Sequence, residues 1–297
     1  MSDDDRLRIA FSGLHPIRSR ELRDRFGGAS GATAAIERGR VKASESIRAS
    51  IAVPSDQRRA ELAELGIDVV FRGDSTYPDH LDVFEDAPDV LFVRGPLPQD
   101  AGVGIVGTRK CTAYGLELAE AYGRAVAETG WLVVSGLARG IDGAAHRGMV
   151  SADGVGIAVL GCGIDVTYPR EHRRLGDQIL EAGGAIVSEY PPGSRPDAWR
   201  FPPRNRIIAG LSAAIVVVEA AKTGGALITA VKAAEYGIPV FAMPGDVDRR
   251  TSEGTNRLIR DGAFPVLDPD DLIEELDLVY GLAHRRRDET PVDHSGR

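Results

Sequence analysis

Cysteine is almost absent from this sequence. Cys111 and Cys162 are the two that occur among 297 residues, which is too few for a disulfide framework or a cysteine-rich zinc site. No apolar run approaches the roughly 20 residues that a membrane-spanning helix needs, since the longest, around residues 213–218, has the length of a strand. The N-terminal MSDDDRLR lacks the basic and then apolar order of a signal peptide. We therefore expect a cytoplasmic protein with no membrane segment.

Lysine is also scarce, so nearly all the positive charge comes from arginine. The net charge of −8 argues against a nonspecific coat on duplex DNA. Arginine offers a planar fork that suits phosphate groups and stacks on bases. A negative total is compatible with one concentrated basic site, and the positions of the arginines must decide whether there is one.

The chain changes character along its length. Residues 1–55 are typical of short helices without strands and predict a small helical module. From residue 102 onward, near-continuous apolar strands alternate with helical patterns. Strands of this kind are buried on both faces, so the pattern predicts a doubly wound, mostly parallel α/β sheet of the Rossmann-like type over residues 56–283. The polar residues 284–297 are predicted to be a disordered, solvated tail.

The predicted elements can be given as ranges. Strands are expected at 66–71, 90–95, 102–107, 131–136, 155–161, 185–189, 213–219, 239–245 and 264–267. Helices are expected at 55–65, 114–129, 140–149, 170–182, 205–211, 225–236, 254–260 and 269–282.

The segments that follow the predicted strands resemble one another. Most combine glycine with a small hydroxyl residue or a cation, as in GTRK (107–110), SGLARGID (135–142) and KTGG (222–225). GCG (161–163) supplies glycine alone, and FPPRNR (201–206) supplies arginine without glycine. Glycine lets backbone amides approach an anion, and arginine adds bidentate contacts to phosphate. Because the carboxyl ends of parallel strands share one edge of the sheet, the sequence predicts a phosphate-binding edge there.

Several chemistries are disfavoured. GVGIVG (102–107) is mostly strand and is followed by Thr-Arg-Lys, so it does not fit the dinucleotide fingerprint. No Walker A sequence occurs, and two cysteines and six scattered histidines match no metal-ligand spacing. We therefore predict no nicotinamide cofactor, no nucleotide hydrolysis and no metal site.

Candidate catalytic groups are few. Neither His146 nor His172 has a nucleophile at a defined spacing, which favours structural hydrogen bonding. Asp142 is either a base or, more in keeping with its place at the start of a helix, a partner of the helix dipole. Glu189 and Glu219 end predicted strands, where orientation of arginine side chains is favoured over proton transfer.

An ordered set of motifs resembles the DNA-processing protein A family, also called Smf. The motifs are VGTR (106–109), SGLARGIDGAAH (135–146), AVLGCGIDVTYPREH (158–172), SEYPPG (188–193), FPPRNRIIAGLS (201–212), VVEAAKTGGALITA (217–230), FAMPGD (241–246) and SEGTNRLIRDGA (252–263). The resemblance covers roughly residues 66–267 and extends more weakly to residues 12–30. It implies a homodimeric, non-catalytic protein that binds single-stranded DNA, protects incoming DNA during natural transformation and helps to load RecA recombinase onto it.

The resemblance also implies a set of DNA-binding residues. Arg109, Arg170 and the run Arg204, Asn205 and Arg206 are expected to line the binding pocket, with Gly107, Thr108, Gly136, Arg139, Gly140, Lys222, Gly224 and Gly225 around it. Phe201, Tyr168 and Tyr190 are candidates for stacking on bases or, equally, for packing beside a proline. No cofactor is implied. Many relatives continue into a winged-helix-like domain, which we do not expect within this sequence.

Two other functions stay open. Phosphoribohydrolases of the same superfamily carry PGGxGTxxE, in which the glutamate serves the reacting ribose. The corresponding stretch here is KTGGALITAVKAAE (222–235), with Ala230 at the place of that glutamate. This argues against hydrolysis without excluding a bound nucleotide, and a nucleotide sensor that signals through a partner is the third possibility.

Overall fold

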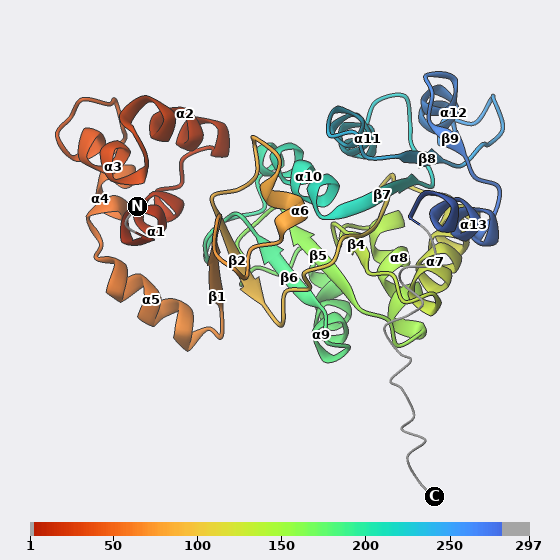
Figure 1. Ribbon diagram of the computed structural model, residues 1–297, viewed down its shortest axis with the longest axis horizontal. Coiled ribbons are helices and arrows are strands. Elements are labelled where there is room, and N and C mark those ends of the chain that lie inside the picture. Colours follow the sequence, from red (N-terminus) through yellow and green to blue (C-terminus); the bar gives the residue numbers. More distant parts are fainter. Residues whose placement is uncertain (1–2, 281–297) are drawn as a thin grey trace, which may run out of the picture.

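The strands of residues 3–280, which the computed structural model describes, form one nine-stranded sheet with the order β1-β2-β6-β5-β4-β3-β7-β8-β9 (Figure 1). Strands β3 to β9 pair in parallel, whereas β1 with β2 and β2 with β6 pair antiparallel. The predicted doubly wound, mostly parallel sheet is therefore confirmed. The strands are β1 (Asp68–Phe71), β2 (Val90–Arg94), β3 (Gly102–Val106), β4 (Val133–Ser135), β5 (Gly156–Leu160), β6 (Ala185–Ser188), β7 (Ser212–Val217), β8 (Val240–Ala242) and β9 (Phe264–Pro265). The predicted tail, residues 284–297, lies outside the described residues.

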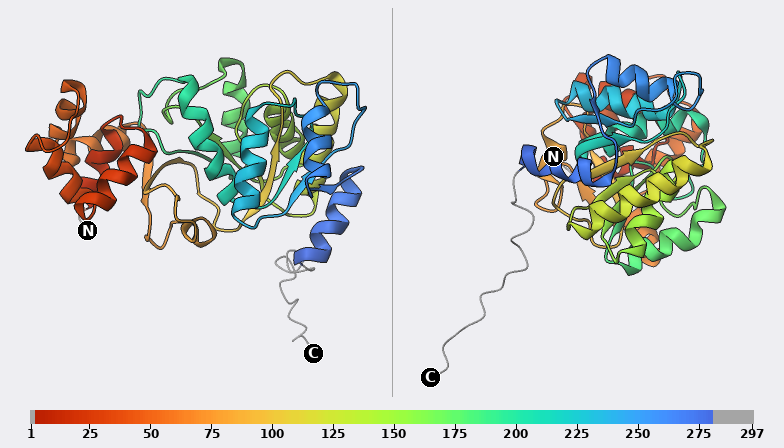
Figure 2. Two further views of the ribbon diagram at one scale, coloured as in Figure 1. Left: turned by 90° about the horizontal axis from the view of Figure 1, so that it is seen from above. Right: turned by 90° about the vertical axis from the view of Figure 1, so that its right-hand side faces the viewer.

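Helices cover both faces of the sheet (Figure 2). One face packs against α7 (Ala113–Glu128), α8 (Ile141–Ser151), α9 (Arg173–Glu181) and α13 (Pro269–Tyr280), and the other against α6 (Asp79–Asp82), α10 (Phe201–Gly210) and α11 (Gly225–Glu235). Helix α12 (Glu253–Arg260) lies beside β8. Within β7, Ala214 and Val216 belong to the first apolar cluster, and Ile215 and Val217 to the second. Successive strand side chains point to opposite faces, which is why a run of apolar residues fits a strand covered on both sides.

Glycines let α7 and α8 approach closely. A Cβ at Gly123 would lie 2.1 Å from the carbonyl oxygen of Ala145, and one at Gly148 would lie 2.0 Å from that of Glu120. No side chain fits in these spaces, so the two helices pack backbone to backbone. This packing fixes the position of α8, whose N-terminus borders the cavity described below.

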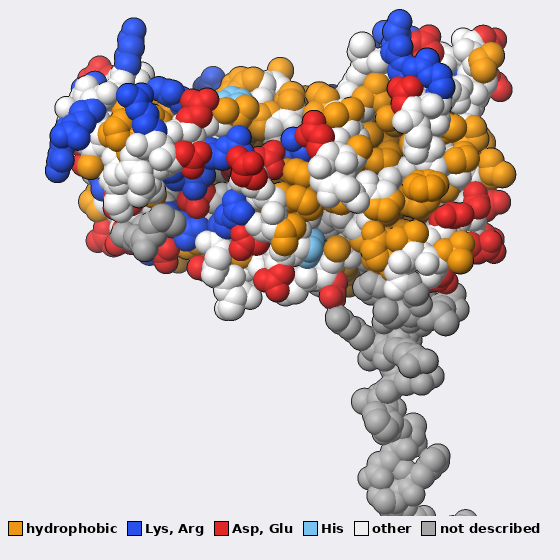
Figure 3. Space-filling model, turned by 45° about the horizontal axis from the view of Figure 1, so that its top comes forward, with side chains coloured by type: hydrophobic (Ala, Val, Ile, Leu, Met, Phe, Trp, Pro, Cys, Tyr) orange, Lys and Arg blue, Asp and Glu red, His pale blue; other side chains and the backbone are white. Residues whose placement is uncertain are grey.

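The N-terminal region is helical, as predicted. It consists of α1 (Asp3–Phe11), α2 (Pro16–Phe26), α3 (Ala29–Glu37) and α4 (Glu45–Ala52), followed by α5 (Ser55–Glu64), which leads to β1. Helices α1–α4, here called the module, share a small apolar cluster of their own. The boundary that we predict between residues 55 and 56 falls at the start of α5. Lys and Arg side chains gather over the module, at the left of Figure 3.

One carboxylate ties the module to the sheet. Asp89, directly before β2, lies 3.0 Å from Nη2 of Arg6 in α1 and 2.7 Å from Nη1 of Arg23 in α2. Arg6 also donates to the backbone carbonyl oxygens of Arg72 and Asp89. The Arg6 and Asp89 side chains are largely buried, so these bonds form in a setting where charge-assisted hydrogen bonds are strong.

Helix α10 begins earlier than the sequence suggested. It starts at Phe201 instead of Asn205, directly after a 3-10 turn at Ala198–Arg200. Pro202 and Pro203 lie in its first turn, where no backbone N–H has an intrahelical partner, so their missing donors cost nothing. Cys111 and Cys162 are free thiols. Within residues 3–280, no helix has both the length and the apolar composition of a membrane-spanning segment.

Candidate functional site

A cavity of about 1100 Å³ opens at the carboxyl ends of β3 and β7. These strands are neighbours from which the chain winds outward in opposite directions, through β4 to one side and through β8 to the other. Such a switch point is where ligands bind in open α/β sheets. The volume slightly exceeds the roughly 300–1,000 Å³ range of small-molecule sites, so it has room for an extended ligand.

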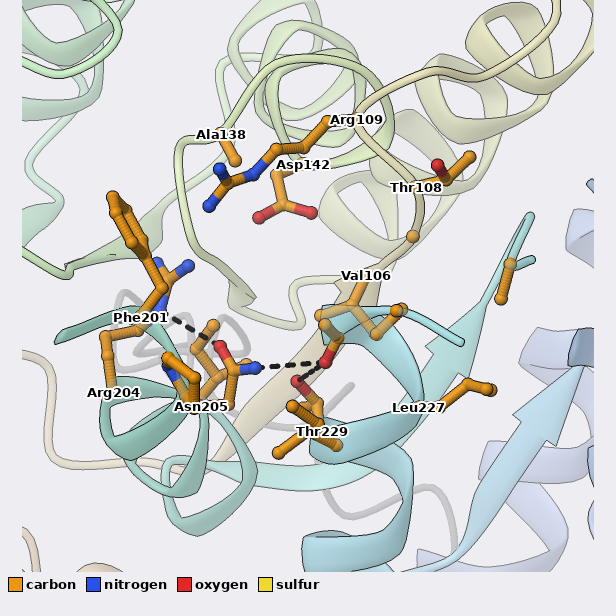
Figure 4. Close-up of a pocket in the computed structure, with 18 of the residues that line it drawn as sticks. Val106, Thr108, Arg109, Ala138, Asp142, Phe201, Arg204, Asn205, Leu227 and Thr229 are labelled. Atoms are coloured by element: carbon orange, nitrogen blue, oxygen red, sulfur yellow. Dashed lines mark hydrogen bonds between the residues drawn. The ribbon is translucent and has the colours of Figure 1, made fainter. Parts of the chain in front are cut away.

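The structure brings seven of the thirteen predicted site residues to this cavity. They come from the segment after β3, from α10 and from the start of α11: Gly107, Thr108, Arg109, Arg204, Asn205, Gly224 and Gly225 (Figure 4). Residues that are more than 100 positions apart in the sequence therefore meet at one edge of the sheet, as the segments after the strands predicted.

Arg109 is the exposed cation of this cavity. Its Cζ lies 4.5 Å from the centroid of the Phe201 ring, within the range of a cation–π contact. Tyr168 also lines the cavity, and its ring centroid is 5.6 Å from that of Phe201. Among the described residues, no carboxylate lies within ion-pair distance of Arg109, so the guanidinium edge is available to an anion while its face rests on an aromatic ring.

The N-terminus of α11 forms a second anion-binding element. Gly224 and Gly225 are exposed and leave the first-turn amides of the helix open to the cavity. The amide of Asn205 donates to the carbonyl oxygen of Gly225 at 3.0 Å and so ties α10 to this turn. Lys222 is exposed just before the turn. The arrangement has the geometry to hold phosphate through backbone amides.

Arg204 has a different environment from Arg109. It is 3% exposed, and its guanidinium donates to the carbonyl oxygens of Gly136 and Val159 and to Oδ1 of Asn205. A Cβ at Gly136 would lie 2.2 Å from Nη1 of Arg204, which explains the glycine there. The predicted residues Gly136 and Arg204 thus support the floor of the cavity.

The prediction that the run Arg204, Asn205 and Arg206 lines one pocket is wrong for Arg206. Its guanidinium pairs with Glu189 at 2.6 Å and donates to the carbonyl oxygen of Asp86 at 2.8 Å, in a neighbouring groove of about 620 Å³. The reason is helical geometry. Consecutive residues of α10 are rotated by about 100°, so three in a row cannot face the same space.

Four other predicted residues lie outside the cavity lining. Arg139 and Arg170 are exposed, and Arg139 pairs with Glu171. Lys222 flanks the cavity without lining it. Gly140 has a φ of +76°, and a Cβ there would lie 2.4 Å from the carbonyl oxygen of Thr108, so it allows the start of α8 to approach the segment after β3.

Some of the residues that were expected to support the site do so as predicted, and others do not. Glu189 orients an arginine, Arg206, as predicted. Glu219 instead accepts hydrogen bonds from the backbone N and Oγ1 of Thr112 at 2.9 and 2.6 Å, and so holds the start of α7. His172 bonds through Nδ1 to the carbonyl oxygen of Leu137, the structural role that was favoured. Tyr190 is 3% exposed, which removes it as a stacking surface.

Asp142 lines the cavity, which the sequence did not predict. It lies in the first turn of α8, where a dipole partner was favoured, but its side chain also lines the cavity. Burial raises the pKa of this carboxyl group, and the charges of Arg204 and Arg109 oppose that rise. Within residues 3–280, no group of three or more His, Cys, Asp or Glu side chains is placed to hold a metal ion.

Comparison with known proteins identifies the relatives of this chain. The family model of DNA recombination-mediator protein A matches residues 68–277. Protein Smf of Escherichia coli is 45% identical over 208 residues, and DNA processing protein DprA of Bacillus subtilis is 40% identical over 220 residues. These alignments cover 69% and 73% of this chain. The chain spans 55% of the length of the E. coli protein and 74% of that of the B. subtilis protein.

Two solved structures are similar over most of the fold. The X-ray structure of DNA processing protein A from Streptococcus pneumoniae matches 90% of this chain and 95% of its own, with a TM-score of 0.75 and 32% identity. A structure that describes the single-stranded DNA binding mode of DNA processing protein A from Helicobacter pylori matches 72% of this chain and 97% of its own, with a TM-score of 0.63 and 27% identity.

Proposed function

The chain belongs to the DNA recombination-mediator protein A family, and from that premise we propose that it binds single-stranded DNA, protects DNA taken up in natural transformation and helps to load RecA onto it. The observation that carries the proposal is the cavity at the β3–β7 switch point. There an unpaired arginine on an aromatic ring and the open amides of α11 face the same space. The H. pylori relative, whose structure concerns single-stranded DNA, supports the assignment.

The chemistry of the cavity favours a single strand over a small ligand. Successive phosphates need several anion sites along a groove, and exposed bases need flat surfaces on which to stack. Arg109 and the start of α11 offer the first, and Phe201 with Tyr168 offers the second. We propose that the protein acts without catalysis and without a cofactor, in the cytoplasm, where this DNA would be met.

The test of this proposal is a salt titration of binding. Fluorescence anisotropy with labelled oligo-dT is competed with unlabelled duplex DNA and with AMP. We expect tight binding of labelled oligo-dT that weakens as the salt concentration rises. Unlabelled oligo-dT should displace the labelled strand, whereas AMP should not. Duplex DNA should compete more weakly than oligo-dT, because paired bases cannot reach the aromatic surfaces. No binding to oligo-dT, together with binding or cleavage of a mononucleotide, would favour the phosphoribohydrolase-like alternative.

Arg109→Ala should weaken single-strand binding for every sequence. If Arg109 neutralises one phosphate, the slope of log affinity against log salt should fall by about 0.7 in magnitude. Arg124→Ala, at an exposed arginine of α7 outside the cavity, is the matched control and should leave affinity and slope unchanged. Unchanged binding in a folded Arg109→Ala protein would remove Arg109 from the interface.

We further propose that the protein is a homodimer joined at the β9 edge of the sheet. Val247, Phe264 and Leu267 are 90%, 53% and 70% exposed near this edge strand, and apolar side chains gather at the right-hand end of the view in Figure 3. Unpaired edges and apolar patches are surfaces that a second chain can cover.

Leu267→Glu should weaken the dimer by more than about 100-fold, because a twofold interface buries the changed side chain twice. Sedimentation equilibrium over a range of concentrations measures the change. Leu65→Glu, at a half-exposed leucine that ends α5, is the control and should leave dimerisation intact. A wild-type protein that stays monomeric at all concentrations would refute this interface.

A further inference from the structure

An anionic side chain faces the middle of a cavity that otherwise suits anions. Figure 4 shows the carboxylate of Asp142 pointing into the open space between Arg109 and Val106. Asp142 is 6% exposed. Within residues 3–280, no side chain donates a hydrogen bond to this carboxylate. A local ion pair therefore does not explain its position.

The surrounding groups leave part of the carboxylate unused. Arg204 is a buried cation whose charge acts on Asp142, but its Nη1 donates to the carbonyl oxygens of Gly136 and Val159 and its Nε donates to Asn205. The backbone at Ala138 and Gly107 interacts with Asp142 from the protein side. An ionised carboxylate has about four acceptor positions, so acceptor capacity remains on the side that faces the cavity.

The ligand must therefore bring a hydrogen-bond donor to this point. Within a DNA strand, phosphate oxygens only accept hydrogen bonds, and the deoxyribose hydroxyls are esterified. The N–H groups of the bases are the remaining donors. A carboxylate that repels phosphate but accepts from N–H groups would turn a strand so that a base, and not its backbone, enters this part of the cavity.

Guanine is the base whose donors fit a carboxylate best. Its N1–H and N2–H₂ groups are adjacent and parallel, so both oxygens of one carboxylate can accept at once, as in the bidentate pairs that arginine forms. Cytosine and adenine offer one amino group beside an acceptor nitrogen. Thymine offers one N–H between two carbonyl oxygens, which a carboxylate repels. The Phe201 and Tyr168 rings, whose centroids lie 5.6 Å apart with their planes inclined at 47°, each offer an aromatic surface to the base.

We propose that Asp142 is a specificity-determining residue that pairs with the N1–H and N2–H₂ edge of a guanine unstacked into the cavity. The inference rests on the proposed binding of single-stranded DNA and adds a base preference to it. The backbone contacts of Arg109 and α11 supply affinity for any sequence, and Asp142 selects the register in which the strand lies.

The experiment measures anisotropy with three oligonucleotides of equal length: all dT, dT with isolated dG residues at regular intervals, and the same with deoxyinosine in place of dG. The full-length wild type should bind the dG strand about tenfold more tightly than all dT. Deoxyinosine keeps N1–H but lacks the N2 amino group, so its strand should bind with intermediate affinity. Asp142→Asn should bind the dG and dT strands alike, because the amide no longer offers two acceptor oxygens to guanine, so the ratio of the two affinities should fall from about ten to about one.

Asp177→Asn, on the exposed side of α9, is the matched control and should keep the preference for dG. Equal binding of dG and dT strands by the wild type would overturn the inference while leaving the proposed function intact. A preference that survives in Asp142→Asn would also overturn it, because the contact would then lie elsewhere. Failure of every strand to bind would instead overturn the proposed function itself.

Discussion

Replacing Arg204 with Ala should lower the free energy of unfolding by about 3–5 kcal/mol, the usual cost of removing one partner from a buried charged network. The guanidinium is 3% exposed and satisfies the carbonyl oxygens of Gly136 and Val159. Without it, both carbonyl oxygens lose a donor and Asp142 loses a buried positive charge that acts on it. Urea denaturation monitored by circular dichroism measures the change.

The exposed Arg170 provides the control for this experiment. Arg170→Ala removes the same side chain from a surface site and should change stability by no more than about 0.5 kcal/mol. A loss below about 1 kcal/mol in Arg204→Ala would contradict a structural role. If the expected loss is found, weaker DNA binding by Arg204 variants is not evidence of a direct contact, and binding should be compared only between folded proteins.

The second large effect concerns acid. His146, in α8, is fully buried, and burial lowers its pKa to about 3 from an ordinary value of about 6.5. The unfolded chain therefore binds a proton on this histidine between these two pH values, and the folded chain does not. The free energy of unfolding should fall by about 1.4 kcal/mol for each pH unit below 6.5, and the loss should end near pH 3.

Comparison with His146→Leu isolates this contribution, because the carboxylates that titrate in the same range are common to both proteins. Urea denaturation between pH 6.5 and 4.5 should give a steeper decline for the wild type, by about 1.4 kcal/mol per pH unit. Arg124→Ala changes no group that titrates in this range and should follow the wild-type slope. Equal slopes for the wild type and His146→Leu would mean that this histidine is protonated in the folded protein.

The sheet could be predicted from sequence because its signal is local. An apolar run such as residues 213–218 fits a strand covered on both sides, and alternate residues of β7 do belong to the two apolar clusters. The antiparallel pairing of β2 with β6 had no such signal, because strand direction depends on the path of the chain between them. The early start of α10 was hidden because two successive prolines resemble a loop unless they lie in the first turn of a helix.

The sequence could predict that the site lies at the carboxyl edge of the sheet, but it could not predict the contacts of each side chain there. Glycine and arginine after buried strands correctly placed Arg109 and Gly225 at one cavity. The sequence could not distinguish an arginine whose face rests on Phe201 from one enclosed by backbone carbonyl groups, because Arg109 and Arg204 differ in tertiary surroundings and not in residue type. Asp142 was named as a possible base or helix-dipole partner, but its place at the cavity could not be predicted, since a carboxylate in the first turn of a helix is common whether or not a cavity lies beside it.

The junction at Asp89 has a mechanical consequence. Two helices of the module each form an ion pair with a single carboxylate next to β2. A force applied to either helix is therefore transmitted to the sheet through Asp89. The module is therefore joined to the sheet by these ion pairs as well as by the chain through α5. A protein that binds the module would be held near one orientation to the edge of the sheet that bears the cavity, and its reorientation would require both Asp89 ion pairs and the bond from Arg6 to the carbonyl oxygen of Arg72 to break.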